Sequence, residues 1–248
     1  TRLAVLAGAL EASLTFSGCA SMSSPASSGP ITIASQGSFY VGGRQVKAAG
    51  TYDAVSTAAP GNAGQTYWVD QMYVQYQVPP HPRKLPLVLV HGGAGTGSVW
   101  ESTPDGREGF QTIFLRRGHA VYIVDVPRGG RSGLPSFNGD FGKLDESQQL
   151  IPPRSARPGR EHAWSRWRLG PEYPQTFAQQ AFPMNAVEPF LKAIRPITSD
   201  DPEAIARALI ALLDRIGPAI VVTHSNGGLR GWLAGARAGL GADTPVGP

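Results

Sequence analysis

The chain has 248 residues, of which 41% are hydrophobic and 16% are charged, a composition that provides a buried core and excludes a disordered charged tail or a coiled coil. Its formal net charge of +4 is too small, and too scattered along the sequence, to predict a nucleic-acid partner. The single cysteine excludes a disulfide framework or a cysteine-based zinc site within the chain. No uncharged apolar run reaches the roughly 18 residues that a transmembrane helix needs.

The first 19 residues have the pattern of an export signal. Arg2 precedes an apolar run over residues 3–16, which ends in the sequence FSGC at Cys19 and resembles a bacterial lipobox. We therefore predict an exported protein that is periplasmic, secreted, or held at the membrane by a lipid on Cys19; a plain signal peptide with an incidental cysteine is the alternative. Residues 20–34 are rich in serine, proline, glycine and alanine and predict a flexible tether.

Short stretches at residues 31–33, 38–41 and 70–78 open the folded part of the chain. Their alternating or β-branched side chains predict antiparallel strands. Continuous apolar runs follow at residues 85–90, 120–124 and 219–222, and such runs are typical of parallel strands that are buried on both faces.

Helical spacing of apolar residues predicts three helices between and after these strands. They cover residues 105–117, residues 201–216 and the segment after Asn226. The last helix is expected to bury the face formed by Leu229, Trp232, Leu233 and Ala236. Alternating strands and helices predict right-handed crossovers and an α/β fold, whose core takes up residues 35–133 and 197–248.

Residues 134–196 interrupt this alternation and predict an insertion that caps the carboxyl edge of the sheet. The segment contains many prolines and a patch rich in arginine and tryptophan, formed by Arg154, Arg157, Arg160, Trp164, Arg166, Trp167 and Arg168. Two interpretations of the patch stay open: a surface for an anionic substrate or an acidic membrane, or a solvated and partly self-packed face of the cap.

The sequence VTHSNGG at residues 222–228 joins the last predicted strand to the last helix. A serine on such a sharp turn is typical of a nucleophile elbow, which holds the Ser225 hydroxyl clear above the sheet and needs small neighbours. Gly227 meets this need, whereas Thr223 stands where a glycine is usual and makes the packing tighter. The alternative is an ordinary turn in which Ser225 caps the helix.

A glycine-rich loop, HGGAGTG at residues 91–97, follows the first parallel strand. Its backbone N–H groups can converge on a small anion, and they predict one donor of an oxyanion hole at Gly93 (or Ala94), with the other at Asn226. His91, Gly92 and His224 are expected to support these loops. A phosphate- or dinucleotide-binding loop is the competing interpretation; it is disfavoured because no lysine follows and the glycines are evenly spaced.

After the second parallel strand, the turn DVPRGGRS at residues 125–132 resembles the D-x-R-G-x-G-x-S turn of α/β hydrolases and predicts a structural role. The resemblance extends further in four strings, which are GSFYVGG (37–43), DQMYVQYQVP (70–79), WESTPDG (100–106) and WRLGPEY (167–173). Over roughly residues 35–233 the chain resembles a small branch of exported bacterial α/β-hydrolase esterases. This resemblance implies a three-layer sandwich with a mostly parallel sheet, and a carboxylic-ester hydrolase with a serine nucleophile and no cofactor. The family elbow ordinarily reads H-S-x-S-G, whereas Asn226 and Gly227 follow Ser225 here.

The family order places an acid and then a histidine after the nucleophile. All five histidines of this chain precede Ser225, and Asp243 is the only acidic residue after residue 226. Because a serine without an aligned base is a weak nucleophile, we expect the acid and the histidine beyond residue 248. We also expect an incomplete C-terminal part of the fold and negligible activity of this chain alone. His162 in the cap is the alternative base.

The sequence thus predicts an exported serine esterase that forms an acyl-enzyme on Ser225. Its partner is a small-molecule ester, with no metal and no nucleic acid, and the oligomeric state is left open. A lactonase or thioesterase of the same fold is the nearest alternative. A non-catalytic surface lipoprotein and a nucleotide-binding module represent different classes.

Overall fold

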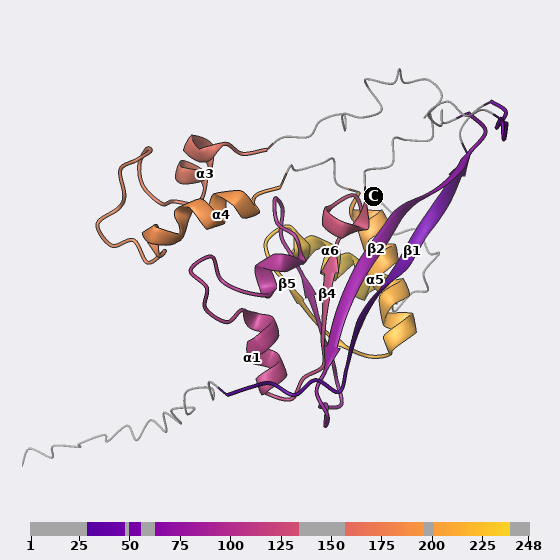
Figure 1. The fold of residues 1–248 in the computed structure, drawn as a ribbon, viewed down its shortest axis with the longest axis horizontal. Coiled ribbons are helices and arrows are strands. Elements are labelled where there is room, and N and C mark those ends of the chain that lie inside the picture. The colour runs from indigo at the N-terminus through magenta and orange to yellow at the C-terminus, as the bar shows by residue number, and fades with distance from the viewer. Residues whose placement is uncertain (1–28, 48–49, 56–62, 134–156, 196–200, 239–248) are drawn as a thin grey trace, which may run out of the picture.

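The computed structural model describes residues 29–47, 50–55, 63–133, 157–195 and 201–238. Its centre is a five-stranded sheet with the order β1-β2-β4-β3-β5 (Figure 1). The strands are β1 (Ser35–Lys47), β2 (Thr66–Val78), β3 (Leu87–Val90), β4 (Val121–Asp125) and β5 (Ile220–Thr223). β2 pairs antiparallel with both β1 and β4, whereas β4, β3 and β5 run parallel to one another.

Helices cover both faces of the sheet, which is why the central strands are continuously apolar. Side chains of β3 alternate between the two faces: Val88 belongs to the cluster that includes Leu209 of α5 (Pro202–Ile216), and Leu89 belongs to the cluster that includes Leu115 of α1 (Phe110–Arg116). The expected α/β fold with a parallel core and antiparallel N-terminal strands is confirmed. The sheet in the described residues is mixed, with two antiparallel and two parallel strand pairs, and is not mostly parallel as expected.

Two elements near the start of the folded part differ from the expectation. Residues 31–33 are not a strand; Ile31 and Ile33 instead pack against the cluster formed by β3, β4 and α1, so chain that was expected to be tether already contacts the core. The expected helix at 105–117 begins only at Phe110. Asp105 lies in the preceding turn, where its carboxylate accepts a hydrogen bond from the Thr103 hydroxyl (2.5 Å), and such side-chain contacts favour turns over helix.

Helix α5 begins and ends where the sequence indicates. The Asp201 carboxylate accepts a hydrogen bond from the Ala204 N–H at 3.0 Å, Pro202 occupies the first turn, and Gly217 ends the helix with a φ of +82°. Aspartate is favoured as an N-cap, proline in the first turn and glycine at the C-terminal end of a helix.

Helix α6 (Gly227–Ala238) buries a different face from the expected one. Leu229 and Trp232 are 60% and 81% exposed. The buried positions are Gly227, Arg230, Ala234 and Arg237. Helix α6 lies close to β5 at Gly231, where an added Cβ would lie only 2.7 Å from the Cγ2 of Thr223, so a residue without a side chain fits best at that position.

Residues 157–195, which we call the α3–α4 segment, are the described part of the expected cap. They contain α3 (Arg160–Arg166), the short helix η3 (Met184–Ala186) and α4 (Val187–Ala193). Figure 1 shows α3 and α4 side by side at one end of the molecule. Ala163 and Ile194 pack against Ala94 in the loop after β3, which attaches the segment to the core. No helix within the described ranges has the length and apolar character to cross a membrane.

Candidate active site

Ser225 occupies the turn between β5 and α6 and is exposed. Its φ is +55°, a left-handed conformation that is uncommon for a residue with a side chain and that marks functional turns. Two backbone hydrogen bonds close the turn, from the Gly227 N–H to the His224 carbonyl and from the Gly228 N–H to the Ser225 carbonyl, each at 2.9 Å. The geometry is that of a strained strand-to-helix elbow.

The helix can begin this close to the sheet because Gly227 has no side chain. A Cβ at Gly227 would lie 3.0 Å from the His91 carbonyl oxygen and 3.2 Å from the Val90 carbonyl oxygen. Thr223, which stands where a glycine is usual, is accommodated from the other side by Gly231. The tight packing that the sequence indicated at Thr223 is therefore taken up by a glycine one turn into α6.

The loop after β3 lies directly against the elbow. A Cβ at Gly92 would lie 2.8 Å from the Ser225 Cβ and 2.9 Å from the His224 Nδ1, and one at Gly93 would lie 3.0 Å from the Asn226 Nδ2. The two backbone segments expected to carry oxyanion donors are thus in contact with the serine that the sequence singled out.

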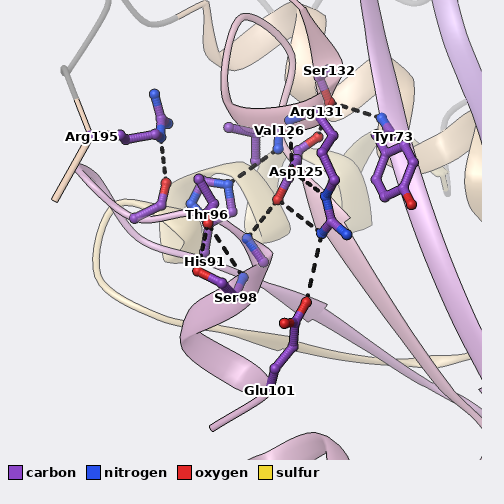
Figure 2. A network of polar contacts seen from close by, with 12 residues as sticks. Tyr73, His91, Thr96, Ser98, Glu101, Asp125, Val126, Arg131, Ser132 and Arg195 are labelled. Atoms are coloured by element: carbon purple, nitrogen blue, oxygen red, sulfur yellow. Dashed lines mark hydrogen bonds and ion pairs between the residues drawn. The ribbon is translucent and has the colours of Figure 1, made fainter. Parts of the chain in front are cut away.

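His91 is fully buried and holds this loop through both ring nitrogens (Figure 2). The Val126 N–H donates to Nε2 at 3.2 Å, so the proton sits on Nδ1, which donates to the Gly92 carbonyl at 2.7 Å. Burial lowers the pKa of His91 to about 4, a shift increased by the positive charges of Arg195 and Arg230. A neutral ring with both nitrogens engaged does not fit the role of general base.

Asp125, at the end of β4, connects the turn after β4 to the loop after β3. Its buried carboxylate accepts hydrogen bonds from the Gly97 N–H (2.5 Å), and from the backbone N–H and Nε of Arg131 (2.8 Å each). Burial alone would raise the pKa of Asp125, but these hydrogen bonds outweigh it and lower the pKa. Ser132, in the short helix η2 (Gly130–Ser132), donates to the Asp125 carbonyl and accepts from the Tyr73 N–H at 2.8 Å (Figure 2).

A cavity of about 550 Å³ opens beside the elbow, between the loop after β3, residues 98–104 and the α3–α4 segment. None of its described lining residues is an Asp, Glu, Lys or Arg. Trp167, Phe182 and Phe190 form one wall, with ring centroids 5.5 Å apart for the pair Trp167–Phe190 and 5.3 Å for Phe182–Phe190. The two phenylalanines carry no signal of the site in the sequence, because no spacing rule relates them to the distant elbow.

The arginines of the cap patch do not line this cavity within the described residues. Arg160 instead donates to the Tyr173 hydroxyl at 3.0 Å and stacks over its ring at 4.8 Å from the centroid. This contact favours the self-packed interpretation of the patch over an anion-binding one. Arg154 lies outside the described residues.

Of the other histidines, His224 directly precedes Ser225 in the elbow and lines the cavity, whereas the remaining three lie away from the elbow or outside the cavity wall. His81 and His119 precede β3 and β4, at the amino ends of the parallel strands and opposite the edge that carries Ser225. His162 lies on α3 but is not among the residues that line the cavity. In the described part of the chain, no group of three or more His, Cys, Asp or Glu residues is arranged to hold a metal ion.

The comparisons with known proteins agree with this geometry. No family profile matches the chain. The solved structure described as "The Atomic Resolution Structure of a Novel Bacterial Esterase" is similar with a TM-score of 0.73 and 33% identity, over 86% of this chain and 67% of that one. "Probable secreted lipase phiG" of Fungal sp. (strain ATCC 74256) is 35% identical over an alignment of 186 residues, and the match covers 71% of this chain and 50% of the relative.

This chain thus spans half the length of the curated relative that it matches. A serine elbow at the carboxyl edge of a parallel sheet, with a glycine-rich loop against it, is the arrangement of the α/β hydrolases. Together with the likeness at 33% identity to a solved esterase, it shows that the chain belongs to the α/β-hydrolase esterase/lipase family.

Proposed function

We propose that the protein hydrolyses carboxylic esters through an acyl-enzyme on Ser225. The observation that carries this proposal is the left-handed Ser225 turn with the Gly92–Gly93 backbone packed against it. The Ser225 oxygen adds to the ester carbonyl carbon, and the amides of Gly93 (or Ala94) and Asn226 hold the resulting oxyanion. Collapse of this intermediate releases the alcohol, and water then hydrolyses the acyl-enzyme to the acid.

The proton of Ser225 needs a base, and we propose that a histidine and an acid following residue 248 supply it. Each of the five histidines of this chain precedes Ser225, and His91 already uses both ring nitrogens. The match to the curated relative covers only half of that protein. We accordingly propose that the 248-residue chain by itself hydrolyses esters negligibly.

We also propose that the protein is exported, with residues 1–19 as the signal and a lipid on Cys19 as a possible anchor. The support is the sequence pattern of this segment and the name of the curated relative, a probable secreted lipase. Residues 1–28 lie outside the described part of the structure. The division into tether, core and cap at residues 20–34, 35–133 with 197–248, and 134–196 stays a prediction as well, except that Ile31 and Ile33 of the expected tether pack against the core.

The nucleophile is tested with the full-length protein and a fluorophosphonate probe, together with short-chain nitrophenyl esters. We expect Ser225→Ala to abolish labelling and turnover, because the hydroxyl that forms the covalent bond is gone. Ser165→Ala, which removes an exposed hydroxyl on α3, is the matched control and should leave both unchanged. A lactone and a thioester assayed in parallel separate the sibling activities.

Two outcomes would contradict the proposal. Labelling that survives in Ser225→Ala would assign the nucleophile to another residue. An intact full-length protein that neither reacts with the probe nor turns over any ester would favour the non-catalytic binding protein.

A further inference from the structure

Arg195, the second residue after α4, contacts the loop after β3 at two successive carbonyl groups. Its backbone N–H donates to the Ala94 carbonyl at 3.0 Å, and its side-chain Nε donates to the Gly95 carbonyl (Figure 2). The preceding residue, Ile194, is buried against Ala94. The end of the α3–α4 segment is therefore attached to the same loop that carries the expected donor at Gly93.

The Arg195 guanidinium also reaches the turn after β4. A Cβ added at Gly129 would lie 2.7 Å from its Cζ and 2.8 and 2.9 Å from its two terminal nitrogens. Since Gly129 has no side chain, the guanidinium lies flat against that backbone. One side chain thus spans the end of α4, the loop after β3 and the turn after β4.

We propose that Arg195 is a positioning residue that fixes the oxyanion donors relative to Ser225. Peptide groups are planar, so holding the Ala94 and Gly95 carbonyls fixes the orientation of the loop on one side of Ala94. The donor amides at Gly93 and Ala94 lie on its other side, and Ala94 itself adopts a φ of +59°. This inference rests on the proposed function, because it assigns those amides to the oxyanion.

The same contact joins the donors to the wall of the cavity. Pro189, Phe190 and Ala193 of α4 line the cavity, and Arg195 follows them by two to six residues. The wall that receives part of the ester and the loop that receives its oxyanion are therefore held as one unit.

The kinetic test uses the full-length protein, a nitrophenyl butyrate substrate and the pair Arg195→Met and Arg195→Lys. A misplacement of donors by about 1 Å costs on the order of 10²-fold in rate, so we expect Arg195→Met to lower kcat by about tenfold to hundredfold while KM changes by less than about threefold. Arg195→Lys, whose ammonium still donates to a carbonyl, should recover most of the loss. Arg160→Met, which removes an arginine of the same segment that contacts Tyr173, is the matched control and should behave like the unaltered protein.

Gly129→Ala provides a second perturbation that keeps the arginine and displaces it. Its φ is −148°, which alanine adopts freely, so the added methyl acts through its contact with the guanidinium. We expect a loss in kcat of the same kind, and no further loss when Gly129→Ala is combined with Arg195→Met. If Arg195→Met does not fold, the kinetics of Gly129→Ala alone test the role of Arg195.

A readout that does not require ester hydrolysis separates this inference from the proposed function. In the 248-residue chain, Arg195→Met should speed hydrogen exchange of the amides at residues 92–97 by about tenfold or more, as local opening becomes easier. It should also raise the pKa of His91, which the Arg195 charge lowers, as followed by its NMR titration. If no ester is turned over, the proposed function fails while these two measurements still decide the role of Arg195.

Three results would overturn the inference. The first is unchanged kcat and unchanged loop exchange in Arg195→Met, and the second is an equal loss in Arg195→Lys. The third is an effect confined to KM, which would make Arg195 a substrate-binding residue.

Discussion

At the scale of single residues, His91 shows how burial decides what a histidine can do. His91 belongs to the loop that lies against Ser225, which would suggest the role of a base. Its ring is fully buried, however, and its two nitrogens bind the backbone of two different loops. The neutral form is required for both hydrogen bonds, since protonated Nε2 cannot accept from the Val126 N–H. The sequence indicated a supporting role, and these contacts give that prediction a physical basis.

The lowered pKa of His91 predicts a loss of stability in mild acid. The ordinary pKa is 6.5 and the folded one about 4, so the unfolded chain binds more protons between these values, and stability falls as the pH decreases from 6.5 towards 4. The full difference corresponds to about 3 kcal/mol. Urea unfolding at pH 7.5, 6.0 and 4.5 should show most of this decrease, whereas the contribution of Asp125 is lost only below its ordinary pKa of 3.8.

The control for this measurement is an amide in place of the ring. His91→Asn retains a donor and an acceptor but has no proton to gain, so its unfolding free energy should lose this dependence on pH. His81→Asn, at an exposed position, should keep it. An equal pH dependence in His91→Asn would assign the acid sensitivity to other groups.

At the scale of elements, the contact between β5 and α6 determines how closely the elbow helix can approach the sheet. Apolar periodicity placed Leu229 and Trp232 on the buried face, because bulky apolar residues usually mark the core side of a helix. The structure instead buries Gly227, Arg230, Ala234 and Arg237, and the helix starts at Gly227, where an added Cβ would lie within 3.2 Å of the Val90 and His91 carbonyl oxygens. The periodicity shows which residues of the helix are apolar, whereas the distance between α6 and β5 depends on a tertiary contact.

A double-mutant cycle tests this element contact. Gly231→Ala alone places a methyl 2.7 Å from the Thr223 Cγ2; the overpacking cost of about 1–3 kcal/mol exceeds the gain in helix propensity of about 1 kcal/mol. In a Thr223→Ala background the nearest atom is the Cβ at 3.9 Å, so the same change should stabilise by about 0.5–1 kcal/mol. Urea unfolding of the four proteins gives the coupling energy. Additivity within about 0.3 kcal/mol would contradict the proposed clash.

At the scale of the whole molecule, β5 is the last strand of the described sheet on its side. Its Ile220 is 43% exposed, and Leu229 and Trp232 of the neighbouring α6 are still more exposed. An open strand edge with apolar residues beside it favours association with another chain. The 248-residue chain is therefore expected to self-associate at micromolar concentration.

Sedimentation velocity tests this expectation. Ile220→Lys combined with Trp232→Lys should shift the chain towards monomer, because charge on an edge opposes pairing. Trp68→Lys, which changes a 62% exposed tryptophan on β2, is the control and should leave the association unchanged. A wild-type chain that is monomeric at these concentrations would remove the basis for the prediction.

The parts that could be predicted from the sequence are those fixed by local chemistry. Continuous apolar runs located β3, β4 and β5, Asp201 and Gly217 marked the ends of α5, and the elbow and the glycine loop were found from their own residues. The wall of the cavity could not be predicted from the sequence, because Phe182 and Phe190 reach the site through tertiary packing of a segment without a regular repeat. For the same reason Arg195, one of the many arginines of the chain, carried no signal of its own.

The aromatic part of the cavity wall comes from the α3–α4 segment between β4 and α5, whereas the elbow and the glycine-rich loop directly follow strands of the sheet. Replacement of the α3–α4 segment is therefore expected to alter which molecules enter the cavity, without altering the Ser225 turn or the glycine-rich loop. One condition applies: the replacement segment must end in a residue that hydrogen-bonds the glycine-rich loop as Arg195 does. The lining of the cavity and the geometry around Ser225 can then change independently, as long as this one contact is kept.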